Sequence, residues 1–353
     1  MSTKKRVLVV DDSVFARKIV SDIIDGCPDL CVVGTAIDGF DALRKVQLLK
    51  PDVVTLDVQM PKMDGIETLK SIMSVSPTRV VMVSSLTTQG AKESMAALRL
   101  GAIDIVAKPH GTHSMGLTAQ AHELIEKVLT AADAKLTSAP VACPPSNRPS
   151  RTPITSSDFP VVVIASSTGG PRALRMVIPA LGDGDGAAYI VVQHLPPGFS
   201  KTLAQDLDGL SMMTVREAES GDIARPGEVL FAKSGFHLVL GRGRAIHLSL
   251  APPMWGVRPS ADMTMTSVAA AFGRRAVGVV LTGMGSDGAA GTRAIKDQGG
   301  ATIAEHESTC VVYGMPRMAV ETGAVDVVQP IDKIPDAISA AVFRTAQRLK
   351  LSA

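Results

Sequence analysis

Four aliphatic residues at 161–164 lead into a loop of small residues, Ser-Ser-Thr-Gly-Gly-Pro at 166–171, and then into a helical pattern at 172–181. This order predicts a buried strand, a tight turn and a helix that begins near a proline. Free amide groups at a helix start favour negative charge. Ser167 therefore suits a nucleophile whose oxyanion these amides stabilise, or else a phosphate-binding or structural turn. The loop alone favours the second interpretation, because a short motif needs its context.

Length and composition limit the remaining possibilities. A chain of 353 residues predicts two domains, and the hydrophobic fraction of 46% is enough for well-filled cores. The formal net charge of +2, without a basic stretch interleaved with aromatic residues, argues against a nucleic-acid partner. No apolar run is long enough to span a bilayer, so we expect a cytoplasmic protein without direct membrane insertion. The four cysteines form no disulfide framework or metal motif.

The first part of the chain alternates strand-like and helix-like patterns. Strands are predicted at 6–10, 32–36, 52–56, 80–85 and 103–106, with helical patterns between them. Such alternation predicts a parallel five-stranded sheet with helices on both faces. A last helix is expected at 119–134.

Polar residues follow the ends of these strands. In a parallel sheet, the carboxyl ends of the strands meet at one edge, where ligands bind. Three carboxylates at that edge repel one another and require a hard divalent cation, for which Mg²⁺ is suited. A lysine and a hydroxyl beside them can hold phosphoryl oxygens. Each residue alone is explained by a cap, a turn or a solvated charge, and Ser84 most readily so, but the whole set predicts a site: Asp11, Asp12, Asp57, Ser84 and Lys108.

Residues 131–157 are rich in Pro, Ser and Thr and predict a semi-stiff linker. The linker separates a first domain at 1–130 from a second domain at 158–353.

In the second domain, three apolar strands lead to residues of catalytic type. Ser167 follows the first strand, His194 follows a strand at 188–193, and Asp287 lies in a glycine-rich loop after a strand at 276–281. If these strands are parallel, the three residues lie at one edge of the sheet. They then suit a nucleophile, a general base and the carboxylate that orients the base. Alone, Asp287 is equally well a helix cap and His194 a histidine bonded to backbone; together they favour catalysis.

The region at 229–250 predicts short hairpins around Gly235 and around the glycines at 241 and 243. Three other histidines, His237, His247 and His306, are discounted as the base, because none follows a long apolar strand into a Pro/Gly break. Residues 305–307, Glu-His-Glu, are expected to be solvated.

Residues 1 to about 125 resemble a two-component receiver domain, which has the flavodoxin-like fold. The resemblance is carried by Val-Asp-Asp at 10–12, Leu-Asp-Val-Gln-Met-Pro-Lys-Met-Asp-Gly at 56–65, Val-Ser-Ser at 83–85 and Lys-Pro at 108–109. It implies that Asp57 accepts phosphate from a histidine kinase. It also implies the remaining roles: Asp12 and Asp57 ligate Mg²⁺, Asp11 acts through water, the Gln59 carbonyl is a further ligand, and Ser84 and Lys108 bind the phosphoryl group. Gln59 departs from close relatives, which often carry an acid there.

Residues from about 158 to 348 resemble the catalytic domain of the chemotaxis protein-glutamate methylesterases, the CheB family. The motifs are Ser-Ser-Thr-Gly-Gly-Pro at 166–171, Gln-His-Leu-Pro at 193–196, Arg-Pro-Ser-Ala-Asp at 258–262 and Leu-Thr-Gly-Met-Gly-Ser-Asp-Gly at 281–288. The resemblance implies a doubly wound α/β serine hydrolase, activated by phosphorylation, that demethylates glutamate esters and deamidates glutamines on chemotaxis receptors without a cofactor. Backbone amides near Thr168 and Met284 are candidates for the oxyanion hole.

A function of another class stays open from the sequence: a response regulator whose second domain is a non-catalytic binding module. The glycine-rich loop and parallel sheet permit it. A pure binding module, however, has no need of a serine, a histidine and an aspartate at three matched strand ends.

Overall fold

The computed structural model describes residues 4–108, 114–135 and 159–350 of the chain. The chain divides into two compact units, Met1–Ala139 and Pro140–Ala353. Most of the predicted linker lies outside the described residues. Among the described helices, none combines the length and hydropathy that a membrane crossing requires.

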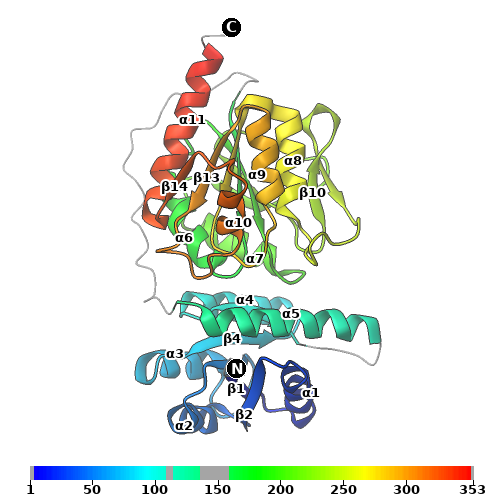
Figure 1. Ribbon diagram of the computed structural model, residues 1–353, viewed down its shortest axis with the longest axis vertical. Helices are drawn as coiled ribbons and strands as arrows, with labels where there is room; N and C mark the ends of the chain where they lie inside the picture. Colours follow the sequence, from blue (N-terminus) through cyan, green and yellow to red (C-terminus); the bar gives the residue numbers. More distant parts are fainter. Residues whose placement is uncertain (1–3, 109–113, 136–158, 351–353) are drawn as a thin grey trace. The chain divides into compact units, whose positions relative to one another are not determined.

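The first unit is built on a parallel five-stranded sheet with the order β2-β1-β3-β4-β5, as predicted (Figure 1). Helix α1 packs against α5, whereas α2 packs against α3 and α3 against α4, so two groups of helices cover the sheet. The elements are β1 Lys5–Val10, α1 Val14–Asp25, β2 Leu30–Ala36, α2 Gly39–Leu49, β3 Val53–Asp57, α3 Gly65–Val75, β4 Arg79–Ser84, α4 Thr88–Arg99, β5 Asp104–Ala107 and α5 Ser114–Asp133.

The central strands of this sheet are buried on both faces. Every residue of β3 is buried, and so are the last four residues of β1. Continuous apolar runs of this kind are typical of parallel strands covered by helices on both sides. Helix α5 begins five residues before the predicted start at 119, at Ser114, and continues through Asp133.

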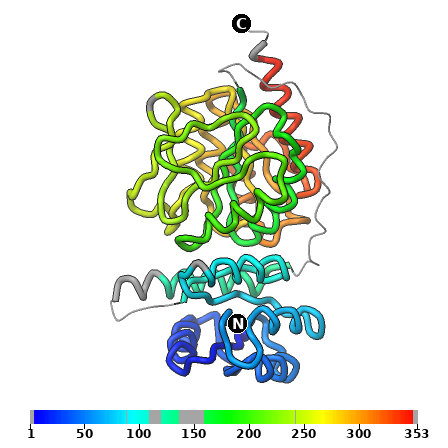
Figure 2. Tube along the Cα trace, turned by 180° about the vertical axis from the view of Figure 1, so that it is seen from behind, coloured from blue at the N-terminus to red at the C-terminus, as the bar shows by residue number. Residues whose placement is uncertain are grey.

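The second unit contains a seven-stranded sheet with the order β14-β13-β12-β6-β7-β9-β8, and all its pairings are parallel. Helices α6, α7 and α11 form one group, and α8, α9 and α10 form another. Figures 1 and 2 show α11 on the opposite side of this unit from α8 and β10. The elements are β6 Val161–Ser166, α6 Gly170–Ala180, β7 Ala188–Gln193, α7 Phe199–Asp208, β8 Thr214–Glu217, β9 Glu228–Phe231, β10 His237–Leu240, β11 Ile246–Ser249, α8 Ala261–Phe272, β12 Ala276–Val280, α9 Ala289–Asp297, β13 Ala301–Glu305, α10 Met315–Glu321, β14 Val327–Gln329 and α11 Ile334–Lys350; three short 3₁₀ turns complete the set.

One predicted hairpin is absent among the described residues. β10 and β11 do form an antiparallel hairpin, around the glycines at 241 and 243. The expected hairpin around Gly235 is wrong, because β9 pairs in parallel with β7 and β8 instead of with β10. Three of the four residues of β9 are buried, and such a strand is stable inside a covered sheet and not in a surface hairpin.

The strand order explains why one edge of the second sheet collects functional residues. From β6 the chain goes to β7, then to the edge strand β8, and back to β9 between these two, before it crosses to β12 on the other side of β6. The order therefore reverses between β6 and β12, and such a switch point leaves a crevice at the carboxyl ends of the strands. Ser167 follows β6 directly at this point.

Candidate catalytic and phosphoacceptor sites

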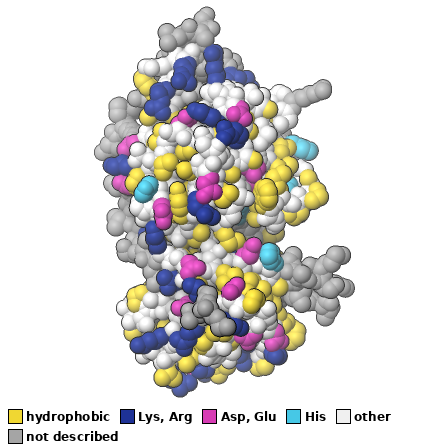
Figure 3. All heavy atoms as spheres, viewed as in Figure 1, with side chains coloured by type: hydrophobic (Ala, Val, Ile, Leu, Met, Phe, Trp, Pro, Cys, Tyr) yellow, Lys and Arg dark blue, Asp and Glu magenta, His cyan; other side chains and the backbone are white. Residues whose placement is uncertain are grey.

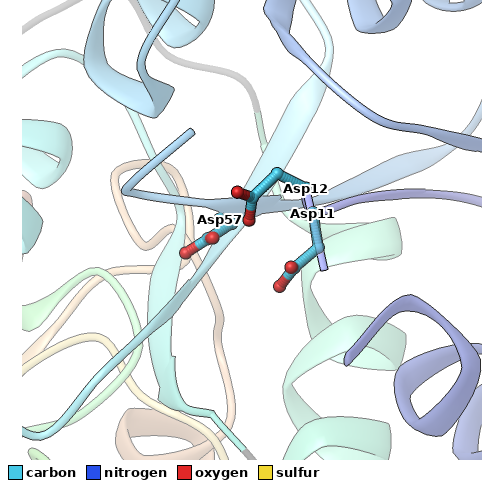
Figure 4. Close-up of side chains that lie close together, drawn as sticks. All are labelled: Asp11, Asp12 and Asp57. Atoms are coloured by element: carbon cyan, nitrogen blue, oxygen red, sulfur yellow. The ribbon is translucent and has the colours of Figure 1, made fainter. Parts of the chain in front are cut away.

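Three carboxylates gather at the carboxyl ends of β1 and β3 (Figure 4). They belong to Asp11, Asp12 and Asp57, and one oxygen from each lies within 4.8 Å of the others. Lys108 Nζ lies 2.7 Å from Asp57 Oδ2 and 2.9 Å from Asp11 Oδ2. An all-oxygen, carboxylate-rich cluster of this size is typical of a Mg²⁺ site in a receiver domain.

The charges of this cluster work against one another. Burial raises the pKa of Asp57, and the neighbouring Asp11 raises it further, while the hydrogen bond from Lys108 lowers it. Burial also opposes the charge of Lys108, but its bonds to the two carboxylates outweigh that effect and raise the Lys108 pKa. A single lysine therefore balances the acidic group only in part, and further positive charge at this edge would be stabilising.

Two other predicted residues lie around this cluster. Ser84 ends β4 and is buried, and its hydroxyl donates to Gly90 O at 3.3 Å. The Gln59 amide N–H donates to Asp57 Oδ1 at 3.4 Å, while its side-chain Nε2 donates to Glu93 Oε2 at 3.3 Å. An acid at position 59 would repel Glu93 in this arrangement, so the glutamine is compatible with its neighbour on α4.

The candidate catalytic residues lie at adjacent strand ends of the second unit. Ser167 follows β6 and His194 follows β7, and these strands are paired up to Ser166 and Gln193. His194 Nε2 lies 2.8 Å from Asp287 Oδ2. Among the described residues, Ser167 Oγ makes no hydrogen bond to His194; such bonds are often long before substrate binds. The structure thus brings His194 and Asp287 into contact and places Ser167 beside them.

Gln193, which the sequence did not single out as a functional residue, connects the serine loop to the histidine strand. Its side-chain Nε2 donates to Ser167 O and to His194 O, both at 2.9 Å, and its Oε1 accepts from Ser166 Oγ at 2.6 Å. A Cβ at Gly170 would meet Gln193 Oε1 at 1.9 Å, so only glycine fits against this amide. The glycine pair of the loop therefore serves close packing as well as the turn.

The start of helix α8 fixes Asp287. The Asp287 carboxylate accepts from Ser260 Oγ at 2.8 Å, from Ala261 N at 2.6 Å and from Asp262 N at 2.9 Å. Burial would raise the Asp287 pKa, but the hydrogen bond and charge of His194 and the α8 amides outweigh it and lower the pKa. His194 and the helix N-terminus together therefore favour the ionised form of this buried carboxylate.

Asp262 completes a reciprocal arrangement between α8 and α9. Its Oδ1 accepts from Gly288 N at 2.9 Å and from Gly291 N at 2.7 Å, at the start of α9, where Gly288 offers no side-chain cap. Asp287, which lies just before α9, thus caps α8, and Asp262, in the first turn of α8, caps α9. Asp287 is a helix cap after all, but of α8 and not of the helix that follows it, so the two interpretations of this residue are compatible.

The two loops that carry the oxyanion-hole candidates, after β6 and after β12, are held together by buried polar groups. Thr168 is buried, and its carbonyl accepts from Thr282 Oγ1 at 3.0 Å. Met284 lies in the loop of Thr282, and the adjacent Gly283 carbonyl accepts from Met315 N at 2.8 Å. Ser167 N donates to Thr282 O at 3.0 Å, which ties this loop to the serine loop.

The expectation that residues 305–307 are solvated is wrong for Glu305. This residue ends β13, is 1% exposed, and accepts from Thr282 N at 2.8 Å. Burial raises its pKa against the opposing effect of its hydrogen bonds. His306 and Glu307 are exposed, as expected. Glu305 thus binds Thr282, whose carbonyl in turn accepts from Ser167 N, and its charged neighbours in sequence did not indicate this role.

Comparisons with known proteins agree with this division of the chain. The family model described as CheB methylesterase matches residues 162–338, and that of the response regulator receiver domain matches residues 7–120. The chain is 48% identical over 350 residues to a protein-glutamate methylesterase/protein-glutamine glutaminase of Symbiobacterium thermophilum, covering 96% of this chain and 97% of that protein. It is 46% identical over 336 residues to the protein of that name from Thermotoga maritima, covering 94% and 96%.

A solved structure agrees for the second unit. The crystal structure of the Thermotoga maritima CheB methylesterase catalytic domain matches with a TM-score of 0.50 and 44% identity, covering 52% of this chain and 98% of that one. The two family models, in this order and with relatives matched over nearly their full length, account for both units. The chain belongs to the CheB family of protein-glutamate methylesterases/protein-glutamine glutaminases, with a receiver domain ahead of the methylesterase domain.

Proposed function

We propose that this chain is a phosphorylation-activated serine hydrolase that demethylates glutamate γ-methyl esters and deamidates glutamines on chemotaxis receptors. The observation that carries the proposal is the 2.8 Å contact of His194 with Asp287 beside Ser167, at adjacent strand ends of a chain of this family. The chain then acts in the cytoplasm, with the receptors as substrates and a chemotaxis histidine kinase as phosphodonor. Neither nucleic acid nor membrane insertion has a part in this function.

The chemistry follows from the positions of the three side chains. His194 meets Asp287 through Nε2, so Nδ1 is the nitrogen that takes the proton from Ser167 Oγ as Oγ attacks the ester carbonyl. Amides near Thr168 and Met284 would stabilise the oxyanion. His194 returns the proton to the leaving methoxide, giving methanol and an acyl-enzyme. Water, deprotonated by His194, then hydrolyses the acyl-enzyme to glutamate. For a glutamine substrate the leaving group is ammonia.

In the receiver domain, Asp57 is the proposed phosphoacceptor. Asp12 and Asp57 would hold Mg²⁺, with Asp11 acting through water and the Gln59 carbonyl as a further ligand. The carboxylate cluster fits such an ion by its donor type and compactness. When bound, the ion would offset negative charge at this edge. Ser84 and Lys108 would bind the phosphoryl oxygens, and Lys108 already faces Asp57.

The proposal is tested by methanol release from receptor membranes carrying methyl esters. We expect the full chain to release methanol faster after addition of a small phosphodonor. We also expect a fragment from residue 159 onward to be active without phosphodonor and faster than the unphosphorylated full chain, because the receiver would no longer restrain it. A folded fragment no faster than the unphosphorylated full chain would show that the receiver activates and does not inhibit.

The support of Asp287 by α8 gives a further prediction. Replacing Ser260 by alanine (Ser260→Ala) removes a hydrogen bond to a buried carboxylate, which is worth about 1.5 kcal/mol or more, so kcat should fall about tenfold with little change in KM. A hydroxyl that donates to a carboxylate favours its ionised form, which lowers the pKa of the acid. Loss of this bond should therefore raise the Asp287 pKa and move the acid limb of the pH–rate profile to higher pH.

The matched control is Ser267→Ala on the same helix, whose hydroxyl bonds Thr264 O and Leu240 N and not Asp287. Both variants should first be compared with the parent by thermal unfolding, because Ser260 also caps α8. An unchanged rate and pH profile in a folded Ser260→Ala protein would show that the backbone amides alone suffice to orient Asp287.

A further inference from the structure

The segment that follows β11 exposes apolar side chains next to the catalytic edge. Leu250 and Trp255 are each 66% exposed and Met254 is 38% exposed, and the two prolines between them are exposed as well. Figure 3 shows hydrophobic side chains gathered on the side of this unit where Figure 1 places β10. Single exposed apolar residues are common, but a contiguous group of them marks an interaction site. Trp255 is the single tryptophan of the chain.

The backbone of this segment is held firmly. Met254 and Val257 exchange two backbone hydrogen bonds, at 3.1 and 3.0 Å, which close a turn around Trp255 and Gly256. Both central residues have positive φ, 54° and 77°. Two-residue turns of this hand favour Asn-Gly, and a bulky residue with positive φ is strained. The turn therefore carries a tryptophan although backbone geometry favours a smaller residue.

Two side chains hold the segment that leads into this turn by hydrogen bonds to residues 250–252. His237 is fully buried; its Nε2 meets Pro252 O at 3.0 Å, and its Nδ1 accepts from Ser260 N at 3.1 Å. Arg258 Nη1 donates to Leu250 O and to Ala251 O. The discounted His237 is thus a structural residue that links the exposed segment to the start of α8. With these supports, the indole is presented in one place and not carried on a loose loop.

The same turn is connected to the catalytic carboxylate. Trp255 Nε1 donates to Asp262 Oδ2 at 3.1 Å, and the other oxygen of Asp262 caps α9 at Gly288, directly after Asp287. This bond uses the only donor of the indole, so the exposed remainder of the ring offers apolar surface. A small ester presents little more than its reacting group to Ser167, whereas a polypeptide that places a glutamate side chain there extends beyond the catalytic edge on both sides.

We propose that the turn at 254–257 is a docking element for the protein substrate, and that Trp255 contacts apolar side chains flanking the esterified glutamate. This inference rests on the proposed function and adds a substrate contact to it. An apolar partner is favoured over a charged one because the charged groups nearby bind within the chain: Arg258 Nη1 donates to two backbone carbonyls, and both Asp262 oxygens accept hydrogen bonds. An exposed, rigid tryptophan is also the type of residue on which protein recognition concentrates.

The test compares two substrates with the full chain in the presence of phosphodonor: methylated receptor membranes, and N-acetyl-glutamate γ-methyl ester amide as a small ester. Trp255→Asn suits the positive φ and keeps the turn. We expect it to lower kcat/KM for the receptor at least tenfold, mainly through KM, and to leave hydrolysis of the small ester within about twofold of the parent. Trp255→Phe, which keeps the apolar ring but loses the bond to Asp262, should recover most of the receptor activity.

The matched control is Met212→Ala. Met212 is 63% exposed but precedes β8. It therefore lies at the amino ends of the parallel strands, opposite the catalytic edge, and neither substrate should be affected. Equal losses on both substrates in Trp255→Asn would overturn the inference, since the turn would then act through Asp287. So would an unchanged receptor kcat/KM. If the parent chain hydrolyses neither substrate, the proposed function itself fails, and the docking role falls with it.

Discussion

Replacing Ser167 by alanine (Ser167→Ala) is expected to reduce methanol release from methylated receptors by a factor of about a thousand or more, because the acyl-enzyme can no longer form. The loop is already built of small residues, and its hydrogen bonds involve the Ser167 backbone and not its hydroxyl, so folding should be nearly unaffected. His194→Ala should lose a comparable factor, since the members of such a group act as a unit.

His122→Ala is the control for the histidine, because His122 is exposed on α5 of the first unit. A serine-directed phosphonate should label the parent chain at Ser167 and should not label Ser167→Ala. Substantial methanol release by Ser167→Ala would show that another group is the nucleophile. Absence of labelling in a phosphorylated parent would instead favour the non-catalytic binding module.

The second large effect concerns the receiver domain. Asp57→Asn should abolish phosphorylation by a small phosphodonor, because the acceptor oxygen is lost, and chelation of Mg²⁺ should do the same to the parent. Phosphate incorporation is the measurement. Asp29→Asn, which alters an exposed acid of the same unit, should be phosphorylated normally. Normal incorporation into Asp57→Asn would identify a different acceptor.

The same substitution has a consequence for stability. Burial and Asp11 raise the folded-state pKa of Asp57, so the folded state disfavours the ionised form, and this residue lowers stability progressively as pH rises through the raised pKa. In Mg²⁺-free buffer, Asp57→Asn should therefore be more stable than the parent at neutral pH. The difference should disappear at a pH below the ordinary carboxyl pKa. Urea unfolding of both proteins at two pH values measures it.

The sequence predicts those parts of the structure whose signals are local. Runs of aliphatic residues identify the strands, and parallel strands necessarily bring their carboxyl ends together. The contact between His194 and Asp287 follows from that rule although 93 positions separate them. The pairing of β9 with β7 could not be predicted in this way, because Glu228–Phe231 lies next to the β10–β11 hairpin in sequence, whereas Tyr189 of β7 lies 40 positions before its partner Val229.

The supporting side chains were missed for a related reason. Gln193 and Ser260 are ordinary polar residues in the sequence, and their partners lie 26 to 27 positions away. Glu305 was expected to be solvated because His306 and Glu307 follow it, and they are exposed. Glu305 is instead buried among tertiary contacts such as the hydrogen bond from Thr282 N, and no pattern around position 305 indicates these contacts.

The reciprocal caps of α8 and α9 affect the order in which the enzyme is assembled. The first amides of each helix find their acceptor on the other helix's side: Ala261 N donates to Asp287, and Gly288 N donates to Asp262. The two helix starts therefore mature together, when the helices dock. Until then, the Asp287 carboxylate that His194 contacts is not fixed in place by the start of α8. If Ser167 and His194 act as we propose, a chain in which α8 and α9 have not docked holds the serine without an oriented histidine–aspartate pair.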